Sequence, residues 1–263
     1  MTAVIEIGSN TVKFLCGSTE RFVPARLSKG LAKTGKIDNE ALFRCVDSIA
    51  ALKDEAFCIG ADEIVCVATA VLRDAANAED FKNALLAETG LEVRVLTGEE
   101  EGRLTYKAVS SIFATEFALA DIGGASTEIT TADKVVSLKL GSMKATDMFA
   151  DPEDAYKYFL SIIPKDFSSP ALAASGGTAV SYAKITHPER EPNGVFVTRE
   201  ELEEAFRRLA AATAEERREI MYFDPPRADV ITAGGAILRA AADFFNADGL
   251  TVTTRSLRHA LAE

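Results

Sequence analysis

The 263-residue chain is short of the residues on which several classes of enzyme depend. It contains no tryptophan, two histidines and four cysteines. His187 and His259 have no partner at the spacing of zinc ligands, so a zinc site and a Ser-His-Asp or Cys-His hydrolase are both disfavoured. The cysteines show no paired spacing, which indicates reduced, packed thiols and predicts a cytoplasmic protein.

Long apolar runs and an excess of positive charge are absent as well. No apolar run is long enough to span a bilayer, and the first residues carry no basic stretch, so we expect neither a membrane span nor a signal peptide. The formal net charge of −11 disfavours nucleic acid and anionic membranes as partners. With 48% hydrophobic residues, the chain can form one large domain or two of ordinary size.

What the chain does contain is a pair of similar strand–turn–strand units. Residues 118–130 begin with an apolar run that ends at Asp121, pass through a turn of small residues and return as a strand that carries Glu128. Residues 4–15 follow the same plan, with Glu6 in the first strand. Alone, the 118–130 unit is explained about as well by an ordinary hairpin. Since small-residue turns expose N–H groups that bind anions, the pair predicts duplicated domains and a cleft lined by phosphate-binding loops.

The remaining patterns predict alternating helices and strands. In the first half we expect helices at 38–60, 77–90 and 98–113, strands at 63–68 and 92–96, and loops at 30–36 and 69–74. In the second half we expect strands at 118–122, 126–131, 135–140, 171–174, 228–232 and 251–254, and helices at 152–162, 179–185 and 233–245, after Thr198 and Thr213, and from 255. Open α/β sheets bind ligands at the carboxyl ends of strands, where the loop at 69–74 is expected.

Seven short segments carry a further pattern. They are residues 5–10, 68–75, 97–104, 121–128, 175–178, 227–231 and 257–260. Together, and in this order over almost the whole chain, they resemble the exopolyphosphatase and guanosine pentaphosphate phosphohydrolase (Ppx/GppA) family. The resemblance implies an α/β fold of duplicated actin-like/sugar-kinase (ribonuclease H-like) domains with a cleft between them. We place the domains at 1–115 and 116–263, with a last helix that can pack back on the first domain.

The resemblance also implies a chemistry. Members release terminal phosphate from polyphosphate or from pppGpp, with Mg²⁺ or another divalent cation. Glu101 would be the base that activates water, with Arg73 and Glu128 as the other catalytic side chains, and Glu6 and Asp121 would hold the metal. The residues that would bind phosphate are Gly8, Ser9, Asn10, Lys13, Gly123, Gly124, Ala125, Ser126, Gly176, Gly177 and Thr178. The turn at 176–178 is explained equally well as a site of close helix–strand packing.

Three residues depart from the family's pattern. Glu6 stands where the family has aspartate, Lys13 where it often has arginine, and Ala125 where a third glycine is usual. If Ala125 needed a positive φ, it would be strained and its methyl group would crowd the anion. A non-catalytic or weakly active binder of signals such as (p)ppGpp is therefore an alternative function.

A small-molecule kinase on the same fold is a further alternative, because residues 233–236 resemble a nucleotide-side turn before a helix. The acidic net charge favours a short polyphosphate as the substrate, since a long polyanion would be repelled. A homodimer is compatible with the sequence.

Overall fold

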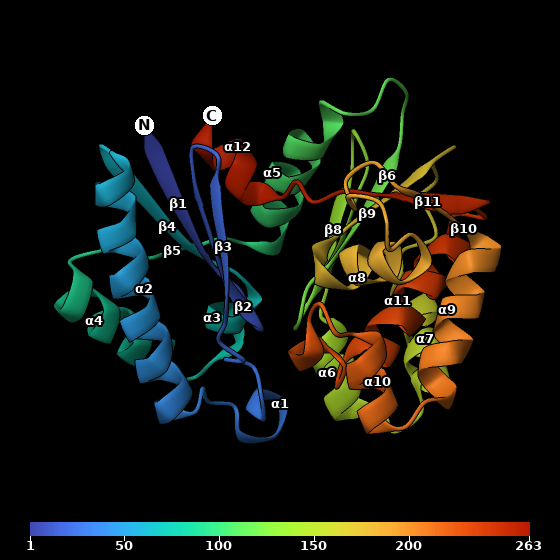
Figure 1. The fold of residues 1–263 in the computed structure, drawn as a ribbon, viewed down its shortest axis with the longest axis horizontal. Helices are drawn as coiled ribbons and strands as arrows, with labels where there is room; N and C mark the ends of the chain where they lie inside the picture. Colours follow the sequence, from blue (N-terminus) through green and yellow to red (C-terminus); the bar gives the residue numbers. More distant parts are fainter.

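The computed structural model describes residues 1–263 as two α/β domains that lie side by side (Figure 1). The sheet of domain I contains β1 (Thr2–Ile7), β2 (Thr11–Cys16), β3 (Thr19–Pro24), β4 (Glu63–Ala68) and β5 (Arg94–Val95). The first three strands form an antiparallel meander, and β4 and β5 extend the sheet in parallel from β1, in the order β3-β2-β1-β4-β5. β1 is buried along almost its whole length, as expected for a central strand.

The sheet of domain II repeats this plan. It contains β6 (Ala118–Ile122), β7 (Thr127–Thr130), β8 (Val135–Leu138), β9 (Leu172–Ser175), β10 (Phe196–Thr198) and β11 (Gly249–Val252). Again three strands form a meander, and β9 and β11 extend the sheet in parallel from β6, while β10 adds an antiparallel edge. The predicted duplicated α/β fold is therefore confirmed.

The helices of domain I are α1 (Leu31–Thr34), α2 (Asn39–Ile59), α3 (Ala70–Asp74), α4 (Ala78–Thr89) and α5 (Gly98–Ser110). The longest, α2, begins where the Asp38 carboxylate accepts a hydrogen bond from the Ala41 N–H, and it ends at Gly60, whose φ of 98° suits glycine. Its buried residues recur at helical spacing, so that one face of α2 packs on the sheet.

The helices of domain II are α6 (Ser142–Met148), α7 (Pro152–Ile162), α8 (Gly176–Thr186), α9 (Arg199–Ala211), α10 (Ala214–Ile220), α11 (Ile231–Phe244) and α12 (Leu257–Ala262), with a 3-10 turn, η1 (Pro225–Arg227). α9 and α10 begin with the predicted capping boxes at Thr198 and Thr213. α11 is buried along most of its length and contacts α6, α7, α8 and α9, so it is the centre of the helical layer.

Four local predictions were wrong. Residues 228–232 form no strand; they are a turn and the first residues of α11, because a short apolar run in a buried helix looks the same as one in a buried strand. The segments at 30–36 and 69–74, which we expected to be loops, contain the short helices α1 and α3. The helix expected from residue 179 already begins at Gly176.

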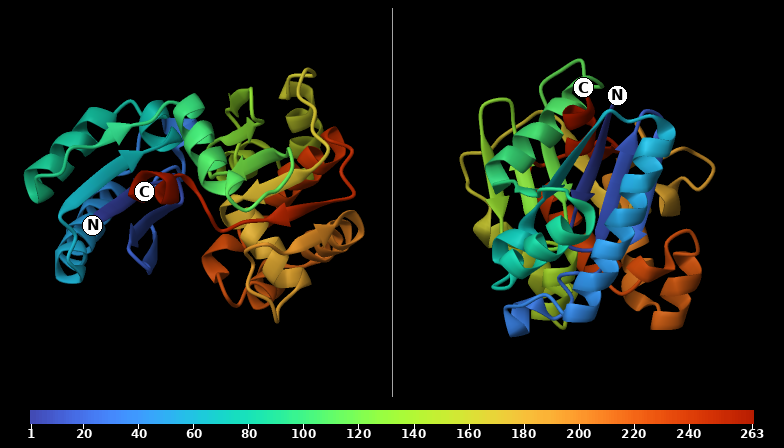
Figure 2. Two further views of the ribbon diagram at one scale, coloured as in Figure 1. Left: turned by 90° about the horizontal axis from the view of Figure 1, so that it is seen from above. Right: turned by 90° about the vertical axis from the view of Figure 1, so that its left-hand side faces the viewer.

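Two connections join the domains, and the second returns the chain to domain I. After β11 the chain leaves domain II, and α12 packs against α5, β1 and β2, where Leu257 contacts Val67 and Leu96. Seen from above, the two chain ends lie on the same side of domain I (Figure 2). The boundary at 115/116 stays a prediction, because α5 also packs on β7 and β8 of domain II. None of the helices is both long and apolar enough to cross a membrane.

Candidate active site

The two hairpin turns face each other across a narrow cleft between the domains. A Cβ atom added to Gly124 would lie 3.0 Å from the Cβ of Ser9 and 3.5 Å from the backbone nitrogen of Asn10. The cleft has a volume of about 60 Å³ and is lined mostly by polar and glycine residues.

Most of the predicted site residues line this cleft. They are Glu6, Gly8, Ser9, Asn10, Lys13, Glu101, Asp121, Gly123, Gly124, Ala125, Ser126, Gly176 and Gly177. Arg73 and Glu128 lie outside the lining and instead neighbour Glu101. Thr178 also lies outside it: its side chain is fully buried and packs against Gly234, so the structure gives no support for its predicted contact with substrate.

The glycines of the two turns are needed for space and not for an unusual backbone. Gly8, Gly123 and Gly124 have no positive φ. A Cβ atom on Gly8 would lie 2.8 Å from the carbonyl oxygen of Thr11. Gly176, at the start of α8, does adopt a φ of 89°. The close approach of backbone to backbone thus explains the first two turns, and the left-handed conformation explains only the third.

Ala125 has no positive φ either, so the condition under which strain was expected at this position is not met. Its side chain is buried. We predict that Ala125→Gly will not raise phosphate release and will lower the free energy of unfolding by about 0.5–1 kcal/mol, since it removes a buried methyl group and frees the unfolded backbone. Steady-state kinetics and denaturant unfolding check this. A gain in both activity and stability would mean that the methyl group does crowd the site.

Glu101 reaches the cleft because of how α5 begins. The Thr97 hydroxyl accepts a hydrogen bond from the Glu100 N–H, and the Glu100 carboxylate accepts one from the Thr97 N–H. Glu99 binds Arg103 on the exposed face of the helix. Of the three consecutive glutamates, only Glu101 is buried and lines the cleft. Glu100 instead caps the start of the helix, and Glu99 lies on its exposed face.

Arg73 connects Glu101 to a second buried acid. Its Nη1 donates to Glu101 Oε2 (2.9 Å) and to the carbonyl oxygen of Leu96 (2.7 Å), and its Nη2 lies 3.8 Å from Glu128 Oε1. Glu128 also accepts a hydrogen bond from the Ser137 hydroxyl (2.6 Å). The guanidinium of this one α3 residue therefore interacts with carboxylates from both domains.

Burial makes these acids unusually basic. It raises the pKa of Glu101 to about 7, against the lowering effect of Arg73 and with a further rise from Asp121. Burial also raises the pKa of Glu128, helped by repulsion from Glu101, and raises that of Asp121. A carboxylate whose pKa lies near neutrality is well suited to accept a proton from water.

We predict that kcat/KM rises with pH through an apparent pKa of about 7. Below this value Glu101 holds a proton and cannot take one from water, whereas above it the carboxylate is free to do so. A pH–rate profile of phosphate release checks this. A rate that stays level as the pH falls through 7 would exclude Glu101 as the base whose ionisation limits the reaction.

Glu6 and Lys13 form a partly buried ion pair that lines the cleft. They lie opposite each other in the register of β1 and β2, with Lys13 Nζ 2.6 Å from Glu6 Oε1. Burial would raise the pKa of Glu6, but Lys13 and Arg258 together lower it below its usual value. Glu6 is therefore an anion whose charge is largely neutralised by the protein itself.

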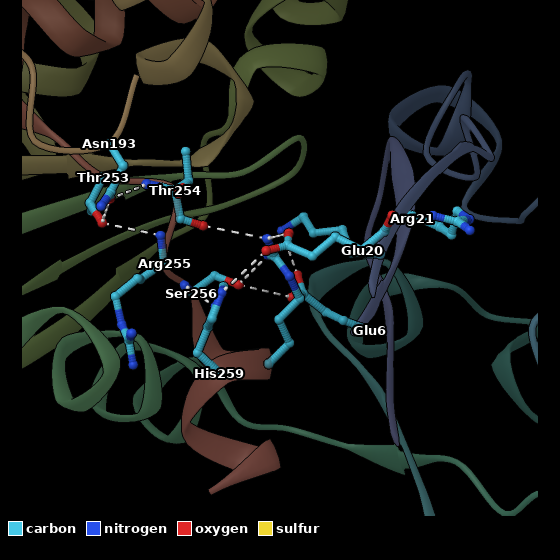
Figure 3. Close-up of polar contacts among 11 residues, drawn as sticks. Glu6, Glu20, Arg21, Asn193, Thr253, Thr254, Arg255, Ser256 and His259 are labelled. Carbon is cyan, nitrogen blue, oxygen red and sulfur yellow. Dashed lines mark hydrogen bonds and ion pairs between the residues drawn. The ribbon is translucent and has the colours of Figure 1, made fainter. Parts of the chain in front are cut away.

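The segment that returns from domain II, around Ser256 and Arg258, also contacts Glu6. The Ser256 hydroxyl donates to Glu6 Oε2 (3.4 Å) and accepts from Arg258 Nη1 (2.5 Å), while Arg258 Nη2 donates to Glu20 (2.7 Å). Figure 3 shows Ser256 and His259 approaching Glu6 and Glu20. These contacts join residues that are far apart in sequence, and no local pattern predicted them.

Arg227 is a cleft residue to which the sequence analysis gave no role. Its Nε donates to Asp224 (2.9 Å), and a Cβ atom on Gly177 would lie 2.2 Å from its guanidinium carbon. α8 begins beside it, so helix N–H groups and a guanidinium face the same end of the cleft, an arrangement that favours an anion. The match of residues 227–231 to the family could have pointed to Arg227. We instead interpreted residues 228–232 as a strand and gave Arg227 no role.

The carboxylates of the cleft have the right chemistry for Mg²⁺ but do not converge on it. No three acidic, histidine or cysteine side chains are placed so that they could hold a metal ion. Glu6 is paired with Lys13, and Asp121 accepts a hydrogen bond from the Thr105 hydroxyl (3.2 Å). In this arrangement the residues do not fit an ion held by Glu6 and Asp121, so we derive no step of the reaction through a metal.

Comparison with known proteins places this chain in a family of phosphatases. The model of the Ppx/GppA phosphatase family matches residues 13–262. Exopolyphosphatase 1 of Mycobacterium tuberculosis is 28% identical over 295 aligned residues, which cover 98% of this chain and 86% of that protein. A bifunctional 3-dehydroquinate synthase/phosphatase of Fusobacterium nucleatum is 25% identical over 96% of this chain and 45% of its own length.

Solved structures show the same fold. The crystal structure of the Aquifex aeolicus Ppx/GppA family member has a TM-score of 0.78 and 26% sequence identity, over 99% of this chain and 95% of that one. An exopolyphosphatase from Cytophaga hutchinsonii has a TM-score of 0.90 at 19% identity, over 98% and 95% of the two chains, which is a likeness of fold.

Proposed function

Because the chain belongs to the Ppx/GppA phosphatase family, we propose that it releases terminal phosphate from inorganic polyphosphate. The observation that supports this most directly is the placement of Glu101. It is a buried carboxylate with a pKa of about 7, and it lines the same cleft as two glycine-containing loops that expose backbone N–H groups.

Phosphoryl transfer to water needs charge neutralisation and positioning more than covalent catalysis. In our proposal the loops at 8–11 and 123–126 hold the terminal phosphoryl group through their N–H groups, and Lys13 and Arg227 offset its charge. Glu101 orients a water molecule and takes its proton. Arg73 holds the Glu101 carboxylate in place through the 2.9 Å bond.

The structure weakens the observations that motivated two other functions. The non-catalytic hypothesis rested partly on strain at Ala125, and that residue has no positive φ. The kinase hypothesis rested on residues 233–236. Gly234 and Gly235 are buried inside α11, where a Cβ atom on Gly235 would lie 1.8 Å from the Tyr182 hydroxyl. That segment packs the core and offers no turn for a nucleotide.

A phosphate-release assay tests the proposal. The purified protein is given tripolyphosphate, longer polyphosphates and pppGpp, each with Mg²⁺ and with EDTA in its place. We expect release from polyphosphate, and its loss in EDTA would establish the divalent-cation dependence that remains a prediction. Tight binding of a phosphorylated nucleotide without turnover of any substrate would favour the binder instead.

A further inference from the structure

The segment between β11 and α12, residues 253–256, connects domain II back to domain I, and we call it the crossover. On the side of domain II it is fixed by the Asn193 side chain, which accepts a hydrogen bond from the Thr254 N–H (3.1 Å). Its last residue, Ser256, lies against Glu6 of domain I (Figure 3). A segment that is held by domain II therefore touches an acid of the cleft.

Arg255 fixes the crossover to a different part of domain I. Its Nε donates to the carbonyl oxygen of Ala108 in the last turn of α5 (2.6 Å), and its Nη2 donates to Glu263 (3.2 Å). A helix leaves its last carbonyl groups without partners inside the helix, so Ala108 can accept this bond without breaking α5. The crossover thus has an anchor on domain I that does not involve Glu6.

The hydrogen bonds of Ser256 have a defined direction. Arg258 Nη1 donates to the Ser256 hydroxyl oxygen (2.5 Å), and a guanidinium cannot accept a hydrogen bond. The hydroxyl hydrogen is therefore free to donate to Glu6 Oε2, which lies 3.4 Å away. The Ser256 N–H is also used, since it donates to Nδ1 of His259 (3.1 Å). Ser256 thus links the cation of Arg258 to the carboxylate of Glu6.

Arg258 is almost fully buried and does not line the cleft. Its side chain is 3% exposed, its Nη2 donates to Glu20 (2.7 Å), and its guanidinium carbon lies 5.2 Å from the centre of the Phe22 ring. Lys13 is the other cation that acts on Glu6, and it lines the cleft with a quarter of its side chain exposed. Of the two cations, only Lys13 can meet a ligand in the cleft.

We propose that Ser256 and Arg258 are positioning residues that keep Lys13 available to the substrate, an inference that rests on the proposed function. Lys13 donates to one oxygen of the Glu6 carboxylate, Oε1 (2.6 Å), and Ser256 donates to the other. Without the Ser256 donor, the carboxylate would depend on Lys13 alone and would hold its ammonium more tightly. With it, Glu6 keeps Lys13 at the cleft and leaves part of its charge for an anion.

The residue type at position 13 makes this help important. The ammonium of lysine is a compact charge, which one carboxylate oxygen can engage almost completely. The planar fork of an arginine could bind a carboxylate and a phosphate through different N–H groups. Because this chain has Lys13, its charge can be shared with the substrate only if Glu6 has a second donor.

The test is Ser256→Ala, which removes the hydroxyl and leaves both anchors of the crossover in place. We expect KM for tripolyphosphate to rise about fivefold, with a smaller change in kcat, as the loss of one hydrogen bond predicts. Arg255→Gln is the matched control, because it loosens the same segment from α5 without touching Glu6, and its KM should stay near the parent value. An equal rise in both variants would mean that Ser256 only holds the segment, and it would overturn the inference.

A double-mutant cycle decides whether Ser256 acts through Lys13. Lys13→Gln should raise KM by itself, and adding Ser256→Ala should then change KM by less than about twofold, because no ammonium is left to release. Effects that multiply instead would refute the proposal. Arg258→Lys keeps a cation beside Ser256 and should raise KM less than Arg258→Gln does, whereas equal values would exclude Arg258 from the chain.

Failure of the proposed function would be a distinct result, since the parent protein would then release no phosphate from tripolyphosphate. Calorimetry of tripolyphosphate binding to the same variants would in that case compare dissociation constants in place of KM, with the same expected order. Melting temperatures near that of the parent protein would show that each variant is folded.

Discussion

Glu101→Gln is expected to lower kcat for phosphate release by about 10²–10⁴-fold, the usual contribution of a general base. Glutamine keeps the size of the side chain and can still accept a hydrogen bond from Arg73 Nη1, but it cannot take a proton from water. KM should change much less than kcat, because the loops proposed to hold the phosphoryl group are unchanged. A fixed-time assay of released phosphate at saturating polyphosphate measures the change in kcat.

The matched control for this variant is Glu99→Gln, two residues earlier on the same helix. Glu99 is exposed and bound to Arg103, so its substitution removes one carboxylate from α5 without reaching the cleft. We expect near-parental kcat for Glu99→Gln. If both variants retained activity, Glu101 would not be the base and the catalytic proposal would fail at its central residue.

Arg73→Gln is expected to be the most damaging substitution next to the cleft, for both rate and stability. It leaves Glu101 and Glu128 as neighbouring buried acids without their cation. The pKa of Glu101, already about 7, should rise further, so that less of the base is ionised at neutral pH. We expect kcat/KM at pH 7 to fall by about 10²-fold or more, with partial recovery as the pH is raised.

The loss of stability in Arg73→Gln should depend on pH in the opposite sense. Both acids have a raised pKa in the folded protein, so the folded state keeps protons that the unfolded state releases, and stability falls as the pH rises through the folded pKa. We expect a loss of about 3 kcal/mol above neutral pH, and a smaller one in acid. Denaturant unfolding at two pH values measures it. Arg94→Gln, which breaks only an exposed pair with Glu100, is the control, and an equal loss in both variants would contradict the buried-charge argument.

The sequence predicted those parts of the fold that depend on neighbouring residues. Short stretches of sequence predicted the hairpin at 118–130, the Asp38 cap of α2 and the capping boxes of α9 and α10. The structure contains all of these features. The strand expected at 228–232 failed because its apolar residues are buried in a helix, and burial on every side removes the periodicity that distinguishes the two.

The residues of the candidate site also fall into those that the sequence indicated and those that only the structure revealed. The repeated strand–turn–strand pattern drew attention to both turns and the resemblance to a family drew attention to Glu101, and these residues do line the cleft. It could not show that Lys13 neutralises Glu6, because that pair depends on the register between two strands. Nor could it show that Arg227 packs on Gly177, a contact between separate elements of domain II. Contacts of this kind depend on tertiary structure, so the sequence around either residue does not predict them.

The returning helix α12 has a consequence for how the molecule is made. It follows the whole of domain II in the chain, yet it packs on domain I, where Leu257 covers Val67 and Leu96 and Ser256 reaches Glu6. As the ribosome delivers the chain from its first residue onward, domain I emerges early but lacks this part of its packing until translation has passed residue 257. The cleft is therefore completed late in synthesis, and phosphatase activity should be absent from nascent chains that end before α12.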